Sequence, residues 1–314
     1  MLTFKRAFSS GRPLLKNYGF IGLGRMGLNM AQNLQAKLDA SDKLYLYDVN
    51  EAAMDLVEGP NVVKAKNVGE VGSECENVIT MLPEGKHVRA VYDELSQAVK
   101  TAGKNDGSKL FIDSSTIDVQ TSLNTARKLR EENVGMFIDA PVSGGVVGAK
   151  NATLCFMIGS NDLSRVKPIL EHMGAKLVSC GEPGAGISAK LANNYLLALS
   201  NIATAESFQL ARKLGLDLNV YSQIVNTSSG RCWSSEVNTP APGTNPNAPS
   251  ARDYEGGFGV ALMNKDLKLA QDAAKLSNLN LLLADRASEI YDQLEADPNC
   301  KPKDMSVVYQ WMDK

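Results

Sequence analysis

The first residues suited to a chemical role form a glycine cluster near the N-terminus. Residues 22–27 read Gly-Leu-Gly-Arg-Met-Gly and directly follow a short apolar run at residues 19–21. In a strand–turn–helix unit, Gly22 permits the tight turn, Gly24 the approach of a pyrophosphate, and Gly27 the close packing of helix on strand. The free N–H groups of the helix N-terminus bind phosphates. This spacing predicts a dinucleotide site made by Gly22, Leu23, Gly24, Arg25, Met26 and Gly27.

An aspartate stands where the second strand of such a unit ends. Asp48 follows the strand-like residues 43–47 and lies about 20 residues beyond the glycines, where an acid accepts hydrogen bonds from both ribose hydroxyls. Its charge would repel a 2′-phosphate, and Val49 and Asn50 bring no arginine to hold one. Asp48 therefore predicts NAD rather than NADP. The alternative is an aspartate that only caps a turn.

A second glycine-rich segment is suited to a carboxylate. Residues 139–149 read Asp-Ala-Pro-Val-Ser-Gly-Gly-Val-Val-Gly-Ala. Ser143, with the backbone N–H groups of Gly144 and Gly145, makes a small cradle of hydrogen-bond donors. The alternative is a glycine-rich strand-to-helix turn without a ligand.

A lysine in an apolar segment is the candidate catalytic residue. Lys190 lies among Ala189, Leu191 and Ala192 early in a long helical stretch, and Asn194 shares its helix face at i+4. A lysine can take the proton of an alcohol only if burial or charge lowers its pKa from about 10.4 toward 7 or 8. The pair places a candidate general base, Lys190, and an amide on one helix face. A solvated surface lysine is the alternative.

The elements that position these residues fall into two patterns. From residue 18 to 181, short apolar runs alternate with helical stretches, which indicates a mostly parallel sheet wound on both faces. Residues 182–314 show only helical stretches, the first over 187–214, and a Pro/Gly-rich loop at 239–259. We predict an α/β fold: a Rossmann-type doubly wound parallel sheet, followed by an all-α C-terminal domain joined by a long interdomain helix.

Composition argues against several other classes of protein. The chain has 314 residues, enough for two domains, and a net charge of -2, which favours neither nucleic acid nor an anionic membrane. No apolar run reaches the roughly 18 to 20 residues that span a bilayer. The five cysteines are scattered and His87 and His172 stand alone, so we expect no disulfide framework and no metal site.

The N-terminal segment differs from the rest of the chain. Residues 1–17 carry four lysines or arginines, two serines and no acid. This composition is typical of a mitochondrial presequence and predicts a protein of the mitochondrial matrix. A disordered basic tail is the alternative.

Four blocks in a fixed order (residues 22–27, 139–145, 190–194 and 265–266) together resemble the β-hydroxyacid dehydrogenase family. The resemblance covers nearly everything after residue 17. It implies that Lys190 is catalytic, that the cradle and Asn194 bind substrate, and that Lys265 closes over the cofactor from the helical domain. A helix-surface charge is the alternative for Lys265. Further cofactor contacts implied by the family are Leu82, Pro83, His87 and Thr116, although a surface position is the favoured alternative for His87.

Residues 228–235, Ser-Ser-Gly-Arg-Cys-Trp-Ser-Ser, resemble the branch of that family that acts on 3-hydroxyisobutyrate, rather than the tartronate-semialdehyde or phosphogluconate branches. The resemblance implies NAD-dependent oxidation of 3-hydroxyisobutyrate to methylmalonate semialdehyde, a step of valine catabolism, by a homodimer or homotetramer. Two alternatives remain: a reductase of another small semialdehyde, of tartronate or succinate type, and a non-catalytic cofactor-binding scaffold protein. Scaffold relatives lose the lysine that this chain keeps as Lys190.

Overall fold

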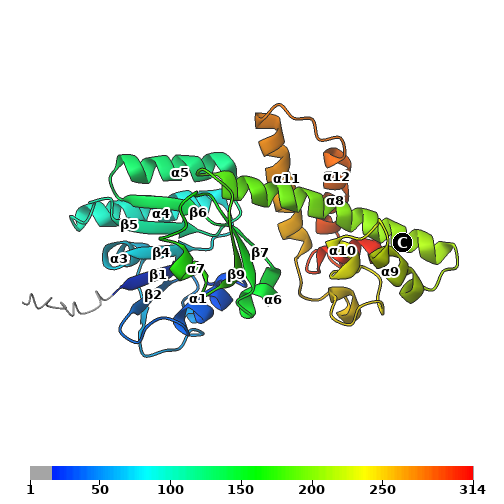
Figure 1. Cartoon of the computed structure of the whole chain (residues 1–314), viewed down its shortest axis with the longest axis horizontal. Helices are drawn as coiled ribbons and strands as arrows, with labels where there is room; N and C mark the ends of the chain where they lie inside the picture. Colours follow the sequence, from blue (N-terminus) through cyan, green and yellow to red (C-terminus); the bar gives the residue numbers. More distant parts are fainter. Residues whose placement is uncertain (1–15, 314) are drawn as a thin grey trace, which may run out of the picture.

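The computed structural model describes residues 16–313. It consists of a sheet-containing part and a helical part, joined by one long helix that belongs to both (Figure 1). Almost all of the basic N-terminal segment lies outside the described residues. Asn17, which we assigned to that segment from the sequence, forms the first residue of the sheet.

The main sheet has six parallel strands in the order β3-β2-β1-β4-β5-β6. Chain order reverses between β1 and β4, and in open α/β sheets ligands bind in the crevice at such a switch point. Every residue of β5 is buried, as expected for a parallel strand covered on both faces. The strands are β1 (Asn17–Ile21), β2 (Lys43–Tyr47), β3 (Val62–Lys64), β4 (Asn77–Thr80), β5 (Lys109–Asp113) and β6 (Gly135–Asp139).

Helices cover both faces of this sheet (Figure 1). Successive strand residues alternate between the faces, so that Phe20 packs in one hydrophobic cluster with Met30 and Ile21 in the other with Tyr92. The Asp118 carboxylate caps the last of these helices by accepting from the backbone N–H of Thr121 at 2.7 Å. The helices are α1 (Gly27–Gln35), α2 (Glu51–Met54), α3 (Val68–Glu74), α4 (Gly85–Thr101) and α5 (Val119–Glu131).

Three further strands form a separate sheet in the order β7-β8-β9. The sequence suggested that the last two continue the main sheet, and it did not reveal β7. Pro141 follows β6 and has no N–H with which to extend its ladder. The chain runs on in the same direction into β7, which pairs antiparallel with β8, while β8 and β9 pair in parallel. The elements are β7 (Val142–Ser143), α6 (Gly145–Lys150), β8 (Leu154–Ile158), α7 (Lys167–Leu170) and β9 (Gly174–Ser179).

The predicted interdomain helix is α8 (Ala185–Lys213), which runs from the sheets into the helical part (Figure 1). Phe208 of α8 packs with Met263 and Tyr291 in the core of the helical domain. The segment between residues 239 and 259 is folded against that core, where the Tyr254 hydroxyl donates to the Pro240 carbonyl at 2.9 Å. The other elements are α9 (Leu218–Thr227), α10 (Trp233–Glu236), η1 (Pro249–Arg252), α11 (Val260–Leu276), α12 (Ala284–Ala296), η2 (Met305–Val307) and α13 (Val308–Trp311).

Candidate active site

The glycine-rich loop joins β1 to α1 and is tightly packed except at its centre. A Cβ atom at Gly22, where φ is +95°, would lie 2.3 Å from the carbonyl oxygen of Met81, and one at Gly27 would lie 1.9 Å from that of Gly22. A Cβ atom at Gly24 would meet no atom within 4 Å. Gly24 therefore borders open space at the end of β1, and the loop fits the pyrophosphate of a dinucleotide.

Asp48 follows β2 and is bonded to the glycine-rich loop. One carboxylate oxygen accepts from the backbone N–H of Leu23 at 2.5 Å, and the other accepts from that of Asn50 at 2.8 Å. Asp48 thus caps its own turn and also fixes the loop. Each carboxylate oxygen can accept a second hydrogen bond, so the capping role leaves room for a ribose. Arg25 is exposed, while Leu23 is buried and Met26 is half-buried.

A buried hydrogen-bond network connects the ends of β4 and β5. Asp113 Oδ1 accepts from the hydroxyls of Thr80, at 2.7 Å, and of Ser115, at 2.5 Å. The Ser115 hydroxyl oxygen in turn accepts from the backbone N–H of Leu82 at 2.8 Å. Burial raises the pKa of Asp113 to about 6. The network holds the two loops that carry Leu82 and Thr116 in a fixed relation; Asp113 was not among the residues predicted for the site.

Lys265 of α11 reaches across to both of these loops. Its Nζ donates to the carbonyl oxygen of Thr116 at 2.8 Å and to that of Pro83 at 3.1 Å. Three residues that the sequence assigned to the cofactor therefore meet at one point. The contact also joins the helical domain to the main sheet domain, on the side where the strands end.

His87 lies in the first turn of α4 and is half-buried. Its Nδ1 is buried and has no hydrogen-bond partner among residues 16–313. An orphaned ring nitrogen beside the β4 loop is a group that a bound dinucleotide can satisfy, so the residue fits the predicted cofactor contact.

Lys190 is only 7% exposed. Within residues 16–313, no group accepts a hydrogen bond from its Nζ, which lies 6.0 Å from the centre of the Phe258 ring. Burial lowers the pKa of Lys190, and the carboxylate of Asp266 opposes this by favouring the charged form. A buried amine without a hydrogen-bond partner is suited to take up a proton from a ligand.

Asn194 lies one turn after Lys190 and is 1% exposed. Its Nδ2 donates to Asp266 Oδ2 at 2.6 Å, and its Oδ1 accepts from Asn193 at 3.0 Å. Asp266 is 2% exposed and was not predicted as a site residue. Its helical spacing from the apolar Met263 places it on the buried face of α11, which is the signal that the sequence offered.

The candidate carboxylate cradle lies at the end of β7. Gly144 has φ of +131° and Gly145 of +61°. Residues other than glycine rarely adopt these backbone conformations. Ser143 is half-buried beside them. The positive φ angles therefore account for glycine at both positions. Gly144 is exposed and Gly145 is half-buried, directly after Ser143.

Asp139 at the end of β6 ties the sheet to α8. Its carboxylate oxygens accept from the backbone N–H groups of Gly184, at 2.8 Å, and of Ile187, at 2.9 Å. Lys190 follows within the same first turns of the helix. Asp139 therefore positions Lys190 relative to the segment that begins with Asp139 and carries Ser143, a role that the sequence did not reveal.

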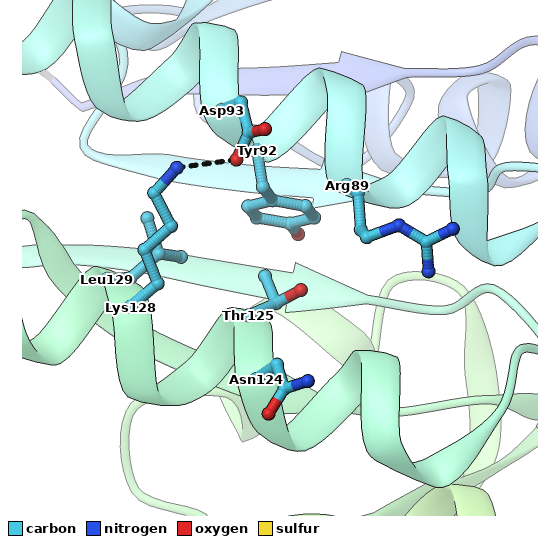
Figure 2. A pocket seen from close by; sticks show the side chains of 7 residues that line it. All are labelled: Arg89, Tyr92, Asp93, Asn124, Thr125, Lys128 and Leu129. Atoms are coloured by element: carbon cyan, nitrogen blue, oxygen red, sulfur yellow. Dashed lines mark hydrogen bonds and ion pairs between the residues drawn. The ribbon is translucent and has the colours of Figure 1, made fainter.

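A separate hollow lies between α4 and α5 (Figure 2). Lys128 and Asp93 bridge it by an ion pair of 2.6 Å, and Tyr92 lies beneath, with its hydroxyl 2.9 Å from that of Thr80. None of the predicted site residues lines it. Among residues 16–313, no helix is long and apolar enough to cross a membrane, and no group of acids, histidines and cysteines has a metal-binding arrangement.

A Rossmann-type sheet with a glycine-rich phosphate loop, joined through a helix with a buried lysine to an all-α domain, defines a two-domain nicotinamide-dependent dehydrogenase. Residues 17–181 match the family described as the NAD binding domain of 6-phosphogluconate dehydrogenase. Residues 184–312 match the family described as "NAD-binding of NADP-dependent 3-hydroxyisobutyrate dehydrogenase".

Curated relatives match almost the whole chain. The mitochondrial 3-hydroxyisobutyrate dehydrogenase of Drosophila melanogaster is 44% identical over 301 residues, which cover 95% of this chain and 90% of the relative. The enzyme of that name from Homo sapiens is 40% identical over 309 residues, covering 98% of this chain and 88% of the relative. A solved structure of Mycobacterium tuberculosis 3-hydroxyisobutyrate dehydrogenase with L-serine superposes with a TM-score of 0.86 at 37% identity, covering 96% of this chain and all of that one.

The chain belongs to the 3-hydroxyisobutyrate dehydrogenase family. The matches confirm the predicted fold class, and they confirm that the protein is an oxidoreductase that uses NAD. The fit of the residues to NAD rests on the open space at Gly24, the orphaned nitrogen of His87 and the carboxylate of Asp48.

Proposed function

We propose that this protein oxidises 3-hydroxyisobutyrate to methylmalonate semialdehyde, with Lys190 as the general base. The observation that carries the proposal is the state of Lys190: an amine 7% exposed, with a lowered pKa and no hydrogen-bond acceptor among the described residues. The family membership supplies the substrate class, because the curated relatives are named for 3-hydroxyisobutyrate.

Lys190 acts in its neutral form. Its Nζ accepts the proton of the substrate hydroxyl as the C–O bond becomes a carbonyl. NAD, when bound, supplies the acceptor for the hydride that leaves the same carbon. In the reverse direction the protonated amine donates to the aldehyde oxygen, so one group serves as base and as acid.

The substrate is held at both ends. The Ser143 hydroxyl and the N–H groups of Gly144 and Gly145 bind the carboxylate. At the other end, one N–H of the Asn194 side chain is held by Asp266, and the second N–H donates to the substrate hydroxyl oxygen. Because Asp266 fixes the amide, Asn194 presents a donor of defined direction beside Lys190.

The cofactor is held from both domains. Asp48 accepts from the ribose hydroxyls, and its charge selects NAD over NADP. Lys265, which bonds the carbonyls of Pro83 and Thr116, closes the site from the helical domain. The phosphates and the remaining adenosine side are bound by Gly22, Leu23, Gly24, Arg25, Met26, Gly27, Leu82 and His87.

The chain divides into a presequence over the basic residues before β1, an NAD-binding domain that extends to residue 181 and a substrate and dimerisation domain at 182–314. It works in the mitochondrial matrix on the valine catabolic route. Several of the curated relatives are named mitochondrial. The acid-free basic composition of the first residues supports the same destination.

The protein assembles as a homodimer or homotetramer through its helical domain. Support comes from large apolar side chains left exposed there: Leu210 at 60% on α8, Leu214 at 72% directly after it, and Val220 at 51% and Ile224 at 49% on α9. An exposed apolar patch on a soluble domain marks an interaction surface. Light scattering coupled to gel filtration gives the number of subunits.

The test of the proposed activity is a substrate panel. Initial rates of nicotinamide reduction are measured for 3-hydroxyisobutyrate, 3-hydroxypropionate, glycerate, 4-hydroxybutyrate and 6-phosphogluconate, each with NAD and with NADP. The highest kcat/KM for 3-hydroxyisobutyrate with NAD supports the proposal. Preference for glycerate or 4-hydroxybutyrate would favour the alternative, a reductase of tartronate or succinate semialdehyde, and no turnover of any acid would favour a cofactor-binding scaffold.

A further inference from the structure

Cys155 lies directly opposite Ser143 in the antiparallel pair of β7 and β8. Residues opposite one another in such a pair direct their side chains to the same face, with Cβ atoms about 4.5–5.5 Å apart. The adjacent pair, Val142 and Phe156, is buried in the core, so Ser143 and Cys155 face the other way. The thiol therefore lies beside the hydroxyl of the carboxylate cradle.

β8 also lies close to the start of α8. Gly186 is so close to β8 that a Cβ atom there would lie 2.3 Å from the carbonyl oxygen of Met157. Lys190 follows Gly186 by one helical turn on the same helix face, and Cys155 precedes Met157 by two residues on the same strand face. The step from Met157 to Cys155 leads toward the cradle, because Cys155 lies opposite Ser143.

Electrostatics agree with this placement. Burial lowers the pKa of Lys190, and negative charge at Asp266 or on the Cys155 thiol would raise it, so the thiol lies within electrostatic range of the amine. Lys190 is more than nine-tenths buried, and within residues 16–313 its Nζ meets no hydrogen-bond acceptor. Cys155 itself is half-buried. The thiol is thus close to both residues to which we assign the ends of the substrate.

We propose that Cys155 is a specificity-determining residue that contacts the substituent on C2 of the substrate and selects a methyl group over a hydroxyl group. The inference rests on the proposed function. In 3-hydroxyisobutyrate, C2 joins the carboxylate, which we assign to Ser143, to the carbon whose hydroxyl meets Lys190. A side chain placed beside both anchors faces C2.

The chemistry of a thiol accounts for the selection. A cysteine side chain behaves as a small, polarisable apolar group with only a weak donor and acceptor. It packs against the methyl group of 3-hydroxyisobutyrate, whereas the C2 hydroxyl of glycerate loses its hydrogen bonds to water without replacement. A pocket of this kind discriminates against an added hydroxyl by up to about a hundredfold.

The first test compares C155S and C155A with the wild type. A serine hydroxyl can hydrogen-bond the C2 hydroxyl of glycerate, so C155S lowers the ratio of kcat/KM for 3-hydroxyisobutyrate over glycerate by about tenfold or more. C155A offers no hydrogen-bond partner to that hydroxyl, so the ratio of kcat/KM for 3-hydroxyisobutyrate over glycerate stays high. C180S, the same change at the half-buried Cys180 after β9, is the matched control and leaves the ratio unchanged.

The second test uses the wild-type protein and reads binding rather than turnover. Iodoacetamide labelling is followed at Cys155 and Cys180 by mass spectrometry. Addition of 3-hydroxyisobutyrate slows labelling of Cys155 severalfold and leaves Cys180 unaffected.

An active wild type whose ratio is unchanged in C155S, with no protection of Cys155, overturns the inference and leaves the proposed function intact. A wild type without turnover of 3-hydroxyisobutyrate overturns both. Protection of Cys155 together with the shifted ratio supports the inference, and the labelling result decides it if C155S does not fold.

Discussion

Asn194 on α8 donates a hydrogen bond of 2.6 Å to Asp266 on α11, and both side chains are almost fully buried. Asp266 Oδ1 lies 3.4 Å from the amine of Lys265. The carboxylate of Asp266 therefore links Asn194, which we propose binds the substrate, to Lys265, which we propose binds the cofactor. Asp266 also acts on Lys190, because its charge counters the effect of burial on the pKa of that amine.

The link gives a prediction for the pH dependence of oxidation. The rate rises with pH as Lys190 loses its proton, because only the neutral amine is a base. Removing the charge with Asp266→Asn leaves burial unopposed and lowers the pKa of Lys190 further, so the rising limb of the kcat profile shifts to lower pH. Steady-state rates between pH 5 and 10 measure the shift.

Asp272→Asn is the control for this profile, since Asp272 is an exposed acid on the same helix. Asp272→Asn should leave the rising limb of the kcat profile at the same pH as in the wild type. A limb that moves to higher pH in Asp266→Asn, or does not move at all, would show that Asp266 does not stabilise the charged form of Lys190.

Cofactor choice depends on Asp48. Asp48→Asn removes the charge that repels a 2′-phosphate and weakens charged hydrogen bonds to the ribose. The value of kcat/KM for NAD falls about ten- to a hundredfold, and the ratio of NADP to NAD use rises. Asp55→Asn, at an exposed acid on the neighbouring α2 turn, should change neither. An unchanged NADP to NAD ratio in Asp48→Asn would mean that Asp48 only caps its turn.

Asp113 predicts a pH dependence of stability. Its pKa in the folded protein is about 6, raised by burial from 3.8. The folded protein therefore binds a proton at Asp113 more tightly than the unfolded chain does, which stabilises the fold. This stabilisation is complete below pH 4 and is lost as the pH rises through 6. The loss amounts to about 3 kcal/mol at pH 7.

Asp113→Asn keeps an acceptor for Ser115 and removes the titration. The free energy of unfolding in urea should consequently depend less on pH between 4.5 and 7 than in the wild type. If the two proteins show the same pH dependence over this range, Asp113 is ionised in the fold at an ordinary pKa.

The sequence predicted the parts of the site that depend on local spacing. The glycines of residues 22–27 and Asp48 belong to one strand–turn–helix–strand unit, and Lys190 and Asn194 share one helix face, so their arrangement follows from short-range geometry. The buried acids were missed because their partners are distant in the chain. Asp139 bonds Gly184 and Ile187, and Asp266 bonds Asn194, 72 residues away.

The separate three-stranded sheet was missed for a related reason. β7 has only two residues, Val142 and Ser143, which is too short for a recognisable alternation. Its antiparallel pairing depends on β8, which returns alongside it, and not on its own residues. The later strands therefore looked like a continuation of the parallel series.

The most direct test of the account is the replacement of its proposed base. Lys190→Met keeps a long apolar stem in the buried site and removes the amine, while Lys213→Met makes the same change at an exposed position of α8. We predict that kcat/KM for oxidation of 3-hydroxyisobutyrate with NAD falls about 10²- to 10⁴-fold in Lys190→Met, with NAD binding retained, and is unchanged in Lys213→Met. Turnover in Lys190→Met equal to that of the wild type would contradict the account.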